Sequence, residues 1–145
     1  MQTNEASLHA NKEVVVRFNR EAIEGGSEAA IRALVDPEFI NRAAAPGTPS
    51  AVDGLVHMIV NVLHAGLSDV KVEIHDMLAE GDRVVTRKTI RATHSGPFFG
   101  VAATNKRIAI EVIDIVRVRG GRYVEHWASN NLMAIVADLR ASAPR

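Results

Sequence analysis

The spacing of apolar residues changes from helical to alternating near the middle of the chain. In the first part, apolar side chains recur every three or four positions, which is typical of amphipathic helices. The predicted helices run over residues 11–24, from Ser27 to about residue 35, and from Thr48-Pro49 to about residue 63, with a short strand at 38–42. From Val70 onward, apolar and polar residues alternate, which predicts strands. These strands cover residues 70–75, 84–94, 108–118 and 122–127, and a last helix follows over 132–139.

The order of these elements predicts an α+β fold in a single domain over residues 1–145. Helices come first, an antiparallel meander follows, and one helix closes the chain. A chain of 145 residues is long enough to bury a substantial core, and we find no repeat or second domain in it. The chain has no cysteine, which excludes disulfides and cysteine-based metal sites.

Charge and hydropathy exclude several classes of partner. Lys+Arg and Asp+Glu are both 17, so no strong field of one sign attracts nucleic acid or an anionic membrane. Residues 1–13 lack the apolar segment of a signal peptide, and no run approaches the roughly 20 apolar residues of a membrane span. We therefore expect a cytoplasmic protein. His57 and His64 share one side of a predicted helix, but no carboxylate accompanies them at ligand spacing, so we expect no metal there.

The most regular alternation lies in residues 108–127, which we interpret as a β-hairpin that reverses at Gly120-Gly121. β-Branched residues dominate both arms, and glycine adopts the positive φ that a tight turn requires. Apolar residues of the first arm share one face with a single charged residue, Asp114. The register of the hairpin therefore decides which residue meets Asp114.

Two registers are compatible with this hairpin. A loop of only two glycines places Glu125 opposite Val116, on the apolar face. A three-residue loop that begins at Arg119 and contains a glycine bulge keeps that face apolar and leaves Tyr123 and Glu125 outside. The pairs in this second, preferred register are Val116 with Val124, Asp114 with His126, and Val112 with Ala128. It predicts one Asp–His pair within an otherwise apolar surface.

Three short motifs follow one another along nearly the whole chain. They are Pro37-Glu38-Phe39-Ile40-Asn41; Thr93-His94-Ser95-Gly96 leading into Phe99-Gly100-Val101-Ala102-Ala103-Thr104; and Asp114-Ile115-Val116-Arg117-Val118 leading through Gly120-Gly121 to Glu125-His126-Trp127. In this order they resemble the SnoaL-like polyketide cyclases of the NTF2-like superfamily, a group that is also similar to ketosteroid isomerase and limonene-epoxide hydrolase. The resemblance implies a cone, in which a curved sheet and N-terminal helices enclose a pocket. It also implies a homodimer through the outer face of the sheet.

The same resemblance implies a site for acid/base chemistry without metal or cofactor. In the cyclase, an aspartate two residues beyond the histidine of the last strand is the acid/base of an intramolecular aldol ring closure. That histidine corresponds to His126, and the position of the aspartate corresponds to Ala128. Asp114 and Val112 stand where the cyclase has a histidine and a glutamine, and Asn41 is shared. Because Ala128 carries no acid/base group, a role without catalysis stays open.

The pattern Asp114-x-x-Arg117 also resembles a strand of ketosteroid isomerase. The aspartate of that strand stays protonated and donates a hydrogen bond to the developing oxyanion. Burial in an apolar cone is expected to raise the pKa of Asp114 in the same way. The isomerase's base would fall near Asn41-Arg42, where no carboxylate stands.

We expect Asp114 and His126 to form the polar centre of an apolar pocket and to act as proton acceptor and donor. An imidazole titrates near neutral pH, and a neighbouring carboxylate fixes its tautomer. The substrate is then a small hydrophobic, polyketide-like carbonyl compound, and the protein is a cofactor-free cyclase, which is a lyase or isomerase. The alternative is a non-catalytic module that binds a hydrophobic ligand or assembles as a dimer, in which the pair is only a satisfied buried contact.

Further residues complete the expected pocket. The expected substrate-binding residues are Asn41, His94, Val112, Ala128 and Phe99. His94 either lines the mouth of the pocket or caps its strand before Gly96. Phe99 is a packing or rim residue, or part of a stacking surface for a flat ligand, and Trp127 falls on the outer face of the sheet.

Overall fold

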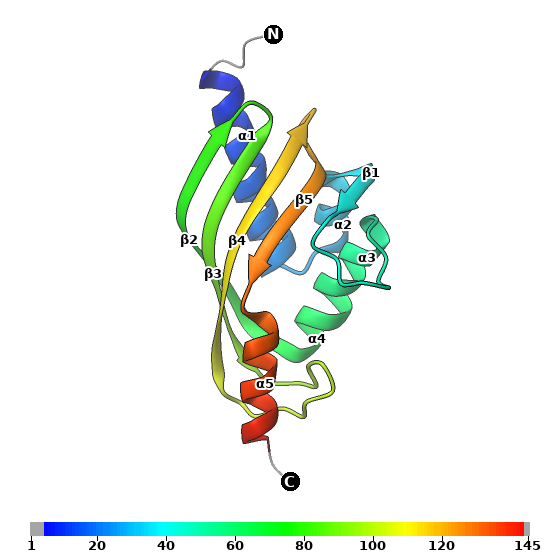
Figure 1. Cartoon of the computed structure of the whole chain (residues 1–145), viewed down its shortest axis with the longest axis vertical. Helices are drawn as coiled ribbons and strands as arrows, with labels where there is room; N and C mark the ends of the chain where they lie inside the picture. Colours follow the sequence, from blue (N-terminus) through cyan, green and yellow to red (C-terminus); the bar gives the residue numbers. More distant parts are fainter. Residues whose placement is uncertain (1–4, 144–145) are drawn as a thin grey trace.

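Helices cover one face of a five-stranded sheet in the computed structural model of the chain, which describes residues 5–143 (Figure 1). The helices are α1 (Glu5–Arg17), η1 (Phe18–Glu24), α2 (Glu28–Leu34), α3 (Val52–Val56), η2 (His57–Leu63), α4 (His64–Gly66) and α5 (Leu132–Ser142). The strands are β1 (Val35–Asn41), β2 (Leu67–Glu80), β3 (Arg83–His94), β4 (Arg107–Arg119) and β5 (Arg122–Asn130). The predicted α+β class is confirmed.

The local signals at the helix starts were read correctly in one case and wrongly in another. Ser27 precedes α2, and its Oγ accepts a hydrogen bond from the N–H of Ala30 at 3.1 Å, as expected of an N-cap. The third helix does not begin at Thr48-Pro49: its first residue is Val52, because the Thr48 hydroxyl donates to the carbonyl of Ala45 and closes a turn in the loop. None of the helices in residues 5–143 combines the length and apolar character that a membrane crossing requires.

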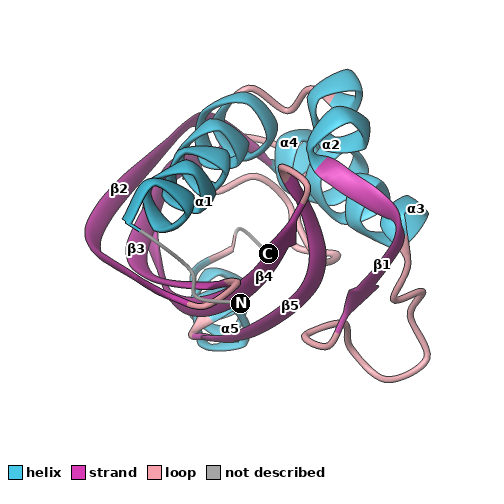
Figure 2. Ribbon diagram, turned by 90° about the horizontal axis from the view of Figure 1, so that it is seen from above, coloured by secondary structure: helices cyan, strands magenta, loops and turns pink. Residues whose placement is uncertain are grey.

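The sheet has the strand order β1-β5-β4-β3-β2 and is antiparallel except at one edge, where β1 runs parallel to β5. Seen from above, it curves around α1, while α2 and α3 lie beside β1 (Figure 2). The inner, concave face carries the core. There, Val84, Val116 and Val118 pack against the α1–η1 residues Val15 and Phe18.

The β4–β5 hairpin turns through only two residues, so the predicted three-residue loop is wrong. Gly120 and Gly121 have φ values of 59° and 77°, and Arg119 pairs with Arg122 across them. Positive φ at both positions is the hairpin turn that matches the twist of the strands. The ladder then shifts by one residue: Val118 pairs with Tyr123, whereas Arg117 pairs with Glu125.

The extra residue is Val124, and this β-bulge, rather than the loop, restores the apolar face. The observed pairs are Val116 with His126, Asp114 with Ala128, and Val112 with Asn130, so the predicted pairs were wrong by two residues. A shift of two residues keeps every side chain on its face, so His126 still lies on the inner face beside Asp114. Between the turn and the bulge, the predicted face of β5 was wrong. Tyr123, which was expected outside, is buried against Phe18, with ring centroids 4.4 Å apart.

Candidate functional site

Five polar side chains form a continuous line across the inner face of the sheet. They are Asn19 of η1, Lys88 of β3, Asp114 of β4, His126 of β5 and Asn41 of β1. Lys88 Nζ donates to Asn19 Oδ1 at 2.7 Å and lies 3.4 Å from Asp114 Oδ2. His126 Nε2 lies 3.4 Å from the same carboxylate oxygen, and its Nδ1 lies 2.9 Å from Asn41 Oδ1. Asp114, the centre of this line, therefore has a cationic or N–H-bearing neighbour on either side.

The hydrogen bonds of Asn41 orient the ring of His126. Asn41 Oδ1 accepts the backbone N–H of Ala43 at 3.0 Å, so the oxygen of this amide, and not its nitrogen, faces His126 Nδ1. This arrangement favours the tautomer with a hydrogen on Nδ1. The other ring nitrogen, Nε2, faces a carboxylate oxygen of Asp114. The imidazole is therefore held between an amide oxygen and a carboxylate.

The electrostatics of Asp114 differ from the expectation. Burial acts to raise the pKa of Asp114, but the hydrogen bond from His126 and the charge of Lys88 outweigh it and hold this pKa below its ordinary value of 3.8. The predicted rise was wrong because it considered desolvation alone and overlooked Lys88. Asp114 is thus an ionised carboxylate at neutral pH, able to accept a proton rather than donate one.

One oxygen of this carboxylate is unused. Oδ2 faces both His126 and Lys88, whereas Oδ1 is buried and has no hydrogen-bond partner among the described residues. An unpaired buried acceptor is costly, typically by about 1–3 kcal/mol. Asp114 therefore has one oxygen that holds it in place and another that is buried without a partner among the described residues.

Tyr123 forms an apolar wall close to this carboxylate. Burial raises the pKa of Tyr123 well above its ordinary value of 10.0, and the negative charge of Asp114 adds to the effect. The phenol stays neutral and stacks on Phe18, 4.4 Å between ring centroids.

The other predicted ligand contacts are divided between the inner face and a distant loop. Val112 is buried on the inner face of β4, and half-buried Ala128 stands directly opposite Asp114. Phe99 lies in the loop after β3, where its ring meets Phe98 edge-on at 4.8 Å. Phe99 is 37% exposed, so it is a surface residue of this loop.

His94 holds that loop against the end of β3. It is fully buried, its Nδ1 accepts the backbone N–H of Thr104 at 3.3 Å, and its Nε2 lies 3.2 Å from the carbonyl of Val101. Both ring nitrogens are thereby engaged with the loop that follows the strand. Trp127, on the outer face as expected, lies under the guanidinium of Arg83 at 5.7 Å.

The sequence interpretation missed Lys88 and Asn19. The signal for Lys88 was present, because it has the parity of Val84, Ile90 and Ala92 along β3 and must therefore point inward. Asn19 gave no comparable signal. It lies in the π-helical turn η1, where its Nδ2 donates to the carbonyl of Val15 at 2.9 Å.

Residues 5–143 contain no group of three or more side chains able to hold a metal ion. His57 contacts Asn61 at 3.3 Å, while His64 donates from Nε2 to the carbonyl of Ile23 at 2.6 Å. The two histidines that share a helix side are therefore used separately, one on the surface and one against η1.

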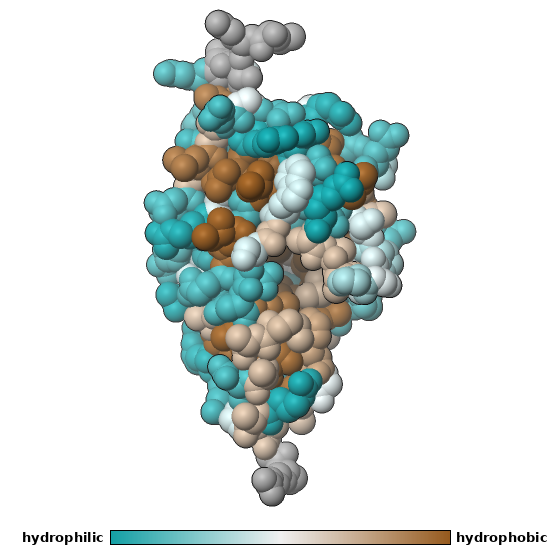
Figure 3. Space-filling model, viewed as in Figure 1, coloured by the Kyte–Doolittle hydropathy of each residue, from teal (hydrophilic) through white to brown (hydrophobic). Residues whose placement is uncertain are grey.

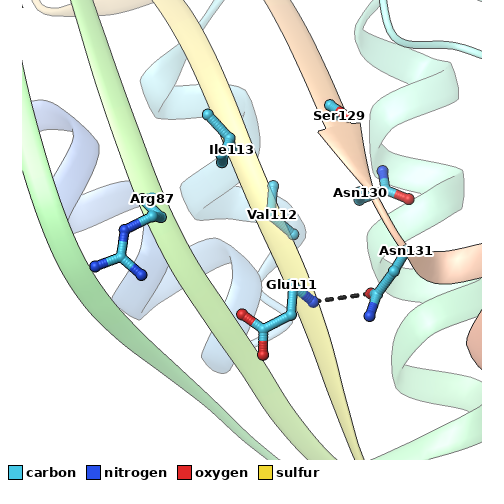
Figure 4. Close-up of a pocket in the computed structure, with 7 residues that line it drawn as sticks. All are labelled: Arg87, Glu111, Val112, Ile113, Ser129, Asn130 and Asn131. Atoms are coloured by element: carbon cyan, nitrogen blue, oxygen red, sulfur yellow. Dashed lines mark hydrogen bonds between the residues drawn. The ribbon is translucent and has the colours of Figure 1, made fainter.

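Two surface pockets lie on opposite faces of the sheet, and neither is lined by Asp114 or His126. One, of about 280 Å³, is on the outer face between β4 and β5 (Figure 4). Figure 4 shows its charged side chains, Arg87 and Glu111, directed away from β5. The other, of about 200 Å³, lies between η1 and β2 and includes Asn19.

Comparison with known proteins agrees with the fold and with the sequence motifs. The model of the SnoaL-like polyketide cyclase family matches residues 13–139. No curated protein matches the chain. Among solved structures, TsrD from Streptomyces laurentii is 22% identical, with a TM-score of 0.80 over 97% of this chain and 99% of that one. IdmH from Streptomyces antibioticus, a candidate polyketide cyclase, is 28% identical, with a TM-score of 0.75 over 89% of this chain and 97% of that one.

A third structure, from Jannaschia sp. CCS1, is a candidate SnoaL-like polyketide cyclase. It is 20% identical and covers 100% of both chains, with a TM-score of 0.83. At this identity the likeness is one of fold, but the family model spans most of the chain. The chain therefore belongs to the SnoaL-like polyketide cyclase family of the NTF2-like superfamily.

Proposed function

We propose that this protein is a cofactor-free acid/base enzyme that acts on a hydrophobic, polyketide-like carbonyl compound as a cyclase or isomerase. The observation that carries the proposal is the asymmetric carboxylate of Asp114, with Oδ2 held and Oδ1 unpaired. Oδ1 is the atom that accepts a proton from the carbon next to the carbonyl. His126, whose ring lies between Asn41 Oδ1 and Asp114 Oδ2, is the donor that returns a proton.

The position of Asp114 supports this assignment. The resemblance to the cyclases places their catalytic aspartate at Ala128, and Ala128 is the direct cross-strand partner of Asp114. Facing residues in an antiparallel pair have Cβ atoms about 4.5–5.5 Å apart. A carboxylate on β4 thus reaches nearly the same volume as one on β5, and the acid/base group is supplied from the neighbouring strand.

Proton abstraction can be tested without knowing the natural substrate. In D₂O, the protein is expected to speed the loss of the α-proton NMR signals of a bicyclic ketone such as 2-tetralone. General base catalysis contributes typically about 10²–10⁴-fold in rate, and Asp114→Asn should lose that factor at a temperature where circular dichroism shows that the variant is folded. His126→Ala should be similarly slow in ketonisation of the enol.

The matched control is Asp138→Asn, which changes an exposed aspartate on α5. It should exchange at the wild-type rate. Exchange that Asp114→Asn leaves unchanged would refute the assignment of the base.

The second candidate is a non-catalytic module that binds a hydrophobic ligand. It is favoured by the alanine at position 128 and by the low exposure of the Asp114 side chain, 8%. A protein of this kind would bind the ketone without exchanging its α-protons, so the same NMR experiment separates the two candidates.

We also propose a homodimer through the outer face of the sheet. Cross-strand partners place an apolar row on this face: Leu78, Val85, Ile115 and Trp127. Leu78 is 67% exposed and the adjacent Ile113 is 52% exposed, and apolar side chains gather among hydrophilic ones over these strands in Figure 3. A two-fold dimer uses the same patch on both subunits, so in it this row would pack against its own copy.

Sedimentation at micromolar concentration tests the dimer. The wild type should sediment as a dimer, and Ile113→Glu, which places a charge in the contact, should sediment as a monomer. Met133→Glu, on α5 and 62% exposed, is the control and should stay dimeric. A monomeric wild type would refute this arrangement.

A further inference from the structure

Lys88 is an ammonium in the interior, and the proton transfers proposed for Asp114 and His126 assign it no step. Its side chain is only 6% exposed, and it stands between Ile74 of β2 and Val112 of β4 on the inner face. A buried cation is costly unless acceptors surround it. Its partners are Asn19 Oδ1 at 2.7 Å and Asp114 Oδ2 at 3.4 Å. An ammonium has three N–H donors, so one donor is left over among the described residues.

A second unused donor lies next to it. Thr86 is the direct cross-strand partner of Asp114, and its side chain points to the same face as Lys88, two residues along β3. Thr86 Oγ1 is buried and has no hydrogen-bond partner among residues 5–143, like Asp114 Oδ1. Two donors and one acceptor therefore stand unpaired on adjacent positions of β3 and β4.

The unpaired donors of the cluster outnumber its unpaired acceptor. Lys88 is cationic and lies 3.4 Å from Asp114 Oδ2, and Thr86 adds a neutral hydroxyl. Asn19, which faces Lys88 from η1, carries no charge, and Tyr123 stays neutral. Two unpaired donors, one of them on an ammonium, favour in a low-dielectric interior a ligand oxygen that brings or develops negative charge.

A pocket lies beside the neighbours of Lys88 on the helix side of the sheet. The pocket of about 200 Å³ between η1 and β2 is lined by Asn19 and Ile74, which are the hydrogen-bond partner and the cross-strand neighbour of Lys88. The pocket's charged residues, Arg20 and Glu24, are one of each sign, and Glu24 accepts the backbone N–H of Val72 at 2.7 Å. The rim thus adds no net charge to that of the interior.

We propose that Lys88 and Thr86 bind the anionic oxygen of an enolate or phenolate, so that the ligands of this site are enolisable ketones and phenols. The proposal rests on the proposed function and extends it from the base to the oxyanion. Asp114 Oδ1 takes the α-proton, the C–H electron pair forms the C=C bond, and the carbonyl oxygen gains the negative charge. The ammonium of Lys88 and the hydroxyl of Thr86 each donate a hydrogen bond to that oxygen.

Binding of para-nitrophenol tests this without turnover, because its phenol and phenolate forms have different absorption spectra. The wild type should bind the phenolate more tightly than the phenol, so the pKa of the bound probe should fall. Lys88→Met should lose roughly 10- to 100-fold in phenolate affinity, as expected for a charge-assisted hydrogen bond, and keep its phenol affinity. Lys71→Met, at an exposed position of β2, should behave like the wild type.

The wild-type measurement decides the question even if Lys88→Met does not fold. A bound probe whose pKa is unchanged or raised, or a phenolate that does not bind, would overturn the inference. Thr86→Val keeps the shape of the side chain and should lose several-fold in phenolate affinity; an unchanged affinity would remove Thr86 from the site. If Lys88-dependent phenolate binding holds and α-proton exchange fails, only the proposed catalysis is wrong. If exchange occurs and phenolate binding ignores Lys88, only this inference is wrong.

Discussion

The single tyrosine of this chain should make its stability fall steeply at alkaline pH. Tyr123 is 3% exposed and stacks on Phe18, and both burial and the charge of Asp114 raise its pKa well above 10.0. The folded protein therefore holds the phenol proton at a pH where the unfolded chain releases it. Stability is unaffected below about pH 10 and falls above it, by about 1.4 kcal/mol per pH unit until the folded pKa is reached. By about pH 11 the loss is about 1.4 kcal/mol.

Urea unfolding, followed by the fluorescence of Trp127, measures this loss. The wild type and Tyr123→Phe are compared at about pH 8 and about pH 11, because the difference between the two proteins cancels the titration of every lysine. The wild type should lose about 1.4 kcal/mol more than Tyr123→Phe between the two pH values. Tyrosinate absorbance should appear only as the protein unfolds. Normal titration of Tyr123 near pH 10 in a protein that is still folded would refute the reasoning.

Three further perturbations follow from the contacts described above. The pKa of Asp114 is lower in the folded protein than its unfolded value of about 3.8, so ionised Asp114 stabilises the fold above that pH. This stabilisation is lost as the pH falls through the folded pKa. Asp114→Asn should therefore flatten the acid limb of a plot of stability against pH. Gly66→Ala should cost about 1–3 kcal/mol in thermal or urea unfolding, because the added Cβ would lie 2.7 Å from Phe98; unchanged stability would show that the loop moves freely. His94→Ala should cost about 2–4 kcal/mol and speed amide hydrogen exchange in residues 95–106, whereas exchange confined to other segments would contradict its role as the anchor of that loop.

The alternation of apolar residues was sufficient to predict the strands, but the register of β4 and β5 was not. Both candidate registers confined any irregularity to the loop itself, whereas the chain uses a two-residue turn together with a bulge at Val124 in the strand. A bulge has no strong residue preference at its extra position, so the residue pattern does not reveal it. Asp114 and His126 still share a face because two displacements of one residue add to a shift of two.

The candidate site was predicted in part. Asp114, His126 and Asn41 do come together, as the motifs implied, although their roles remain predictions. The direction of the pKa shift of Asp114 was wrong because Lys88 was not placed inside. Strand parity alone places it there, but charged residues are rarely buried, and the position of Lys88 was not considered. Asn19 depends on how α1 and η1 pack over the sheet, which the pattern of a single helix does not specify.

The facing positions 114 and 128 also bear on how such sites can change through evolution. Because the two Cβ atoms lie across one rung of the ladder, a carboxylate can be transferred from β5 to β4 in two substitutions, without any movement of the backbone. The intermediate with both carboxylates would be a like-charged pair that shares a proton, and the nearby Lys88 would lessen its cost. A sequence motif compares residues at one position, whereas two positions on facing strands reach nearly the same volume. Under the proposed role of Asp114, family members that lack an aspartate on β5 can be searched for one on β4 before they are counted as inactive.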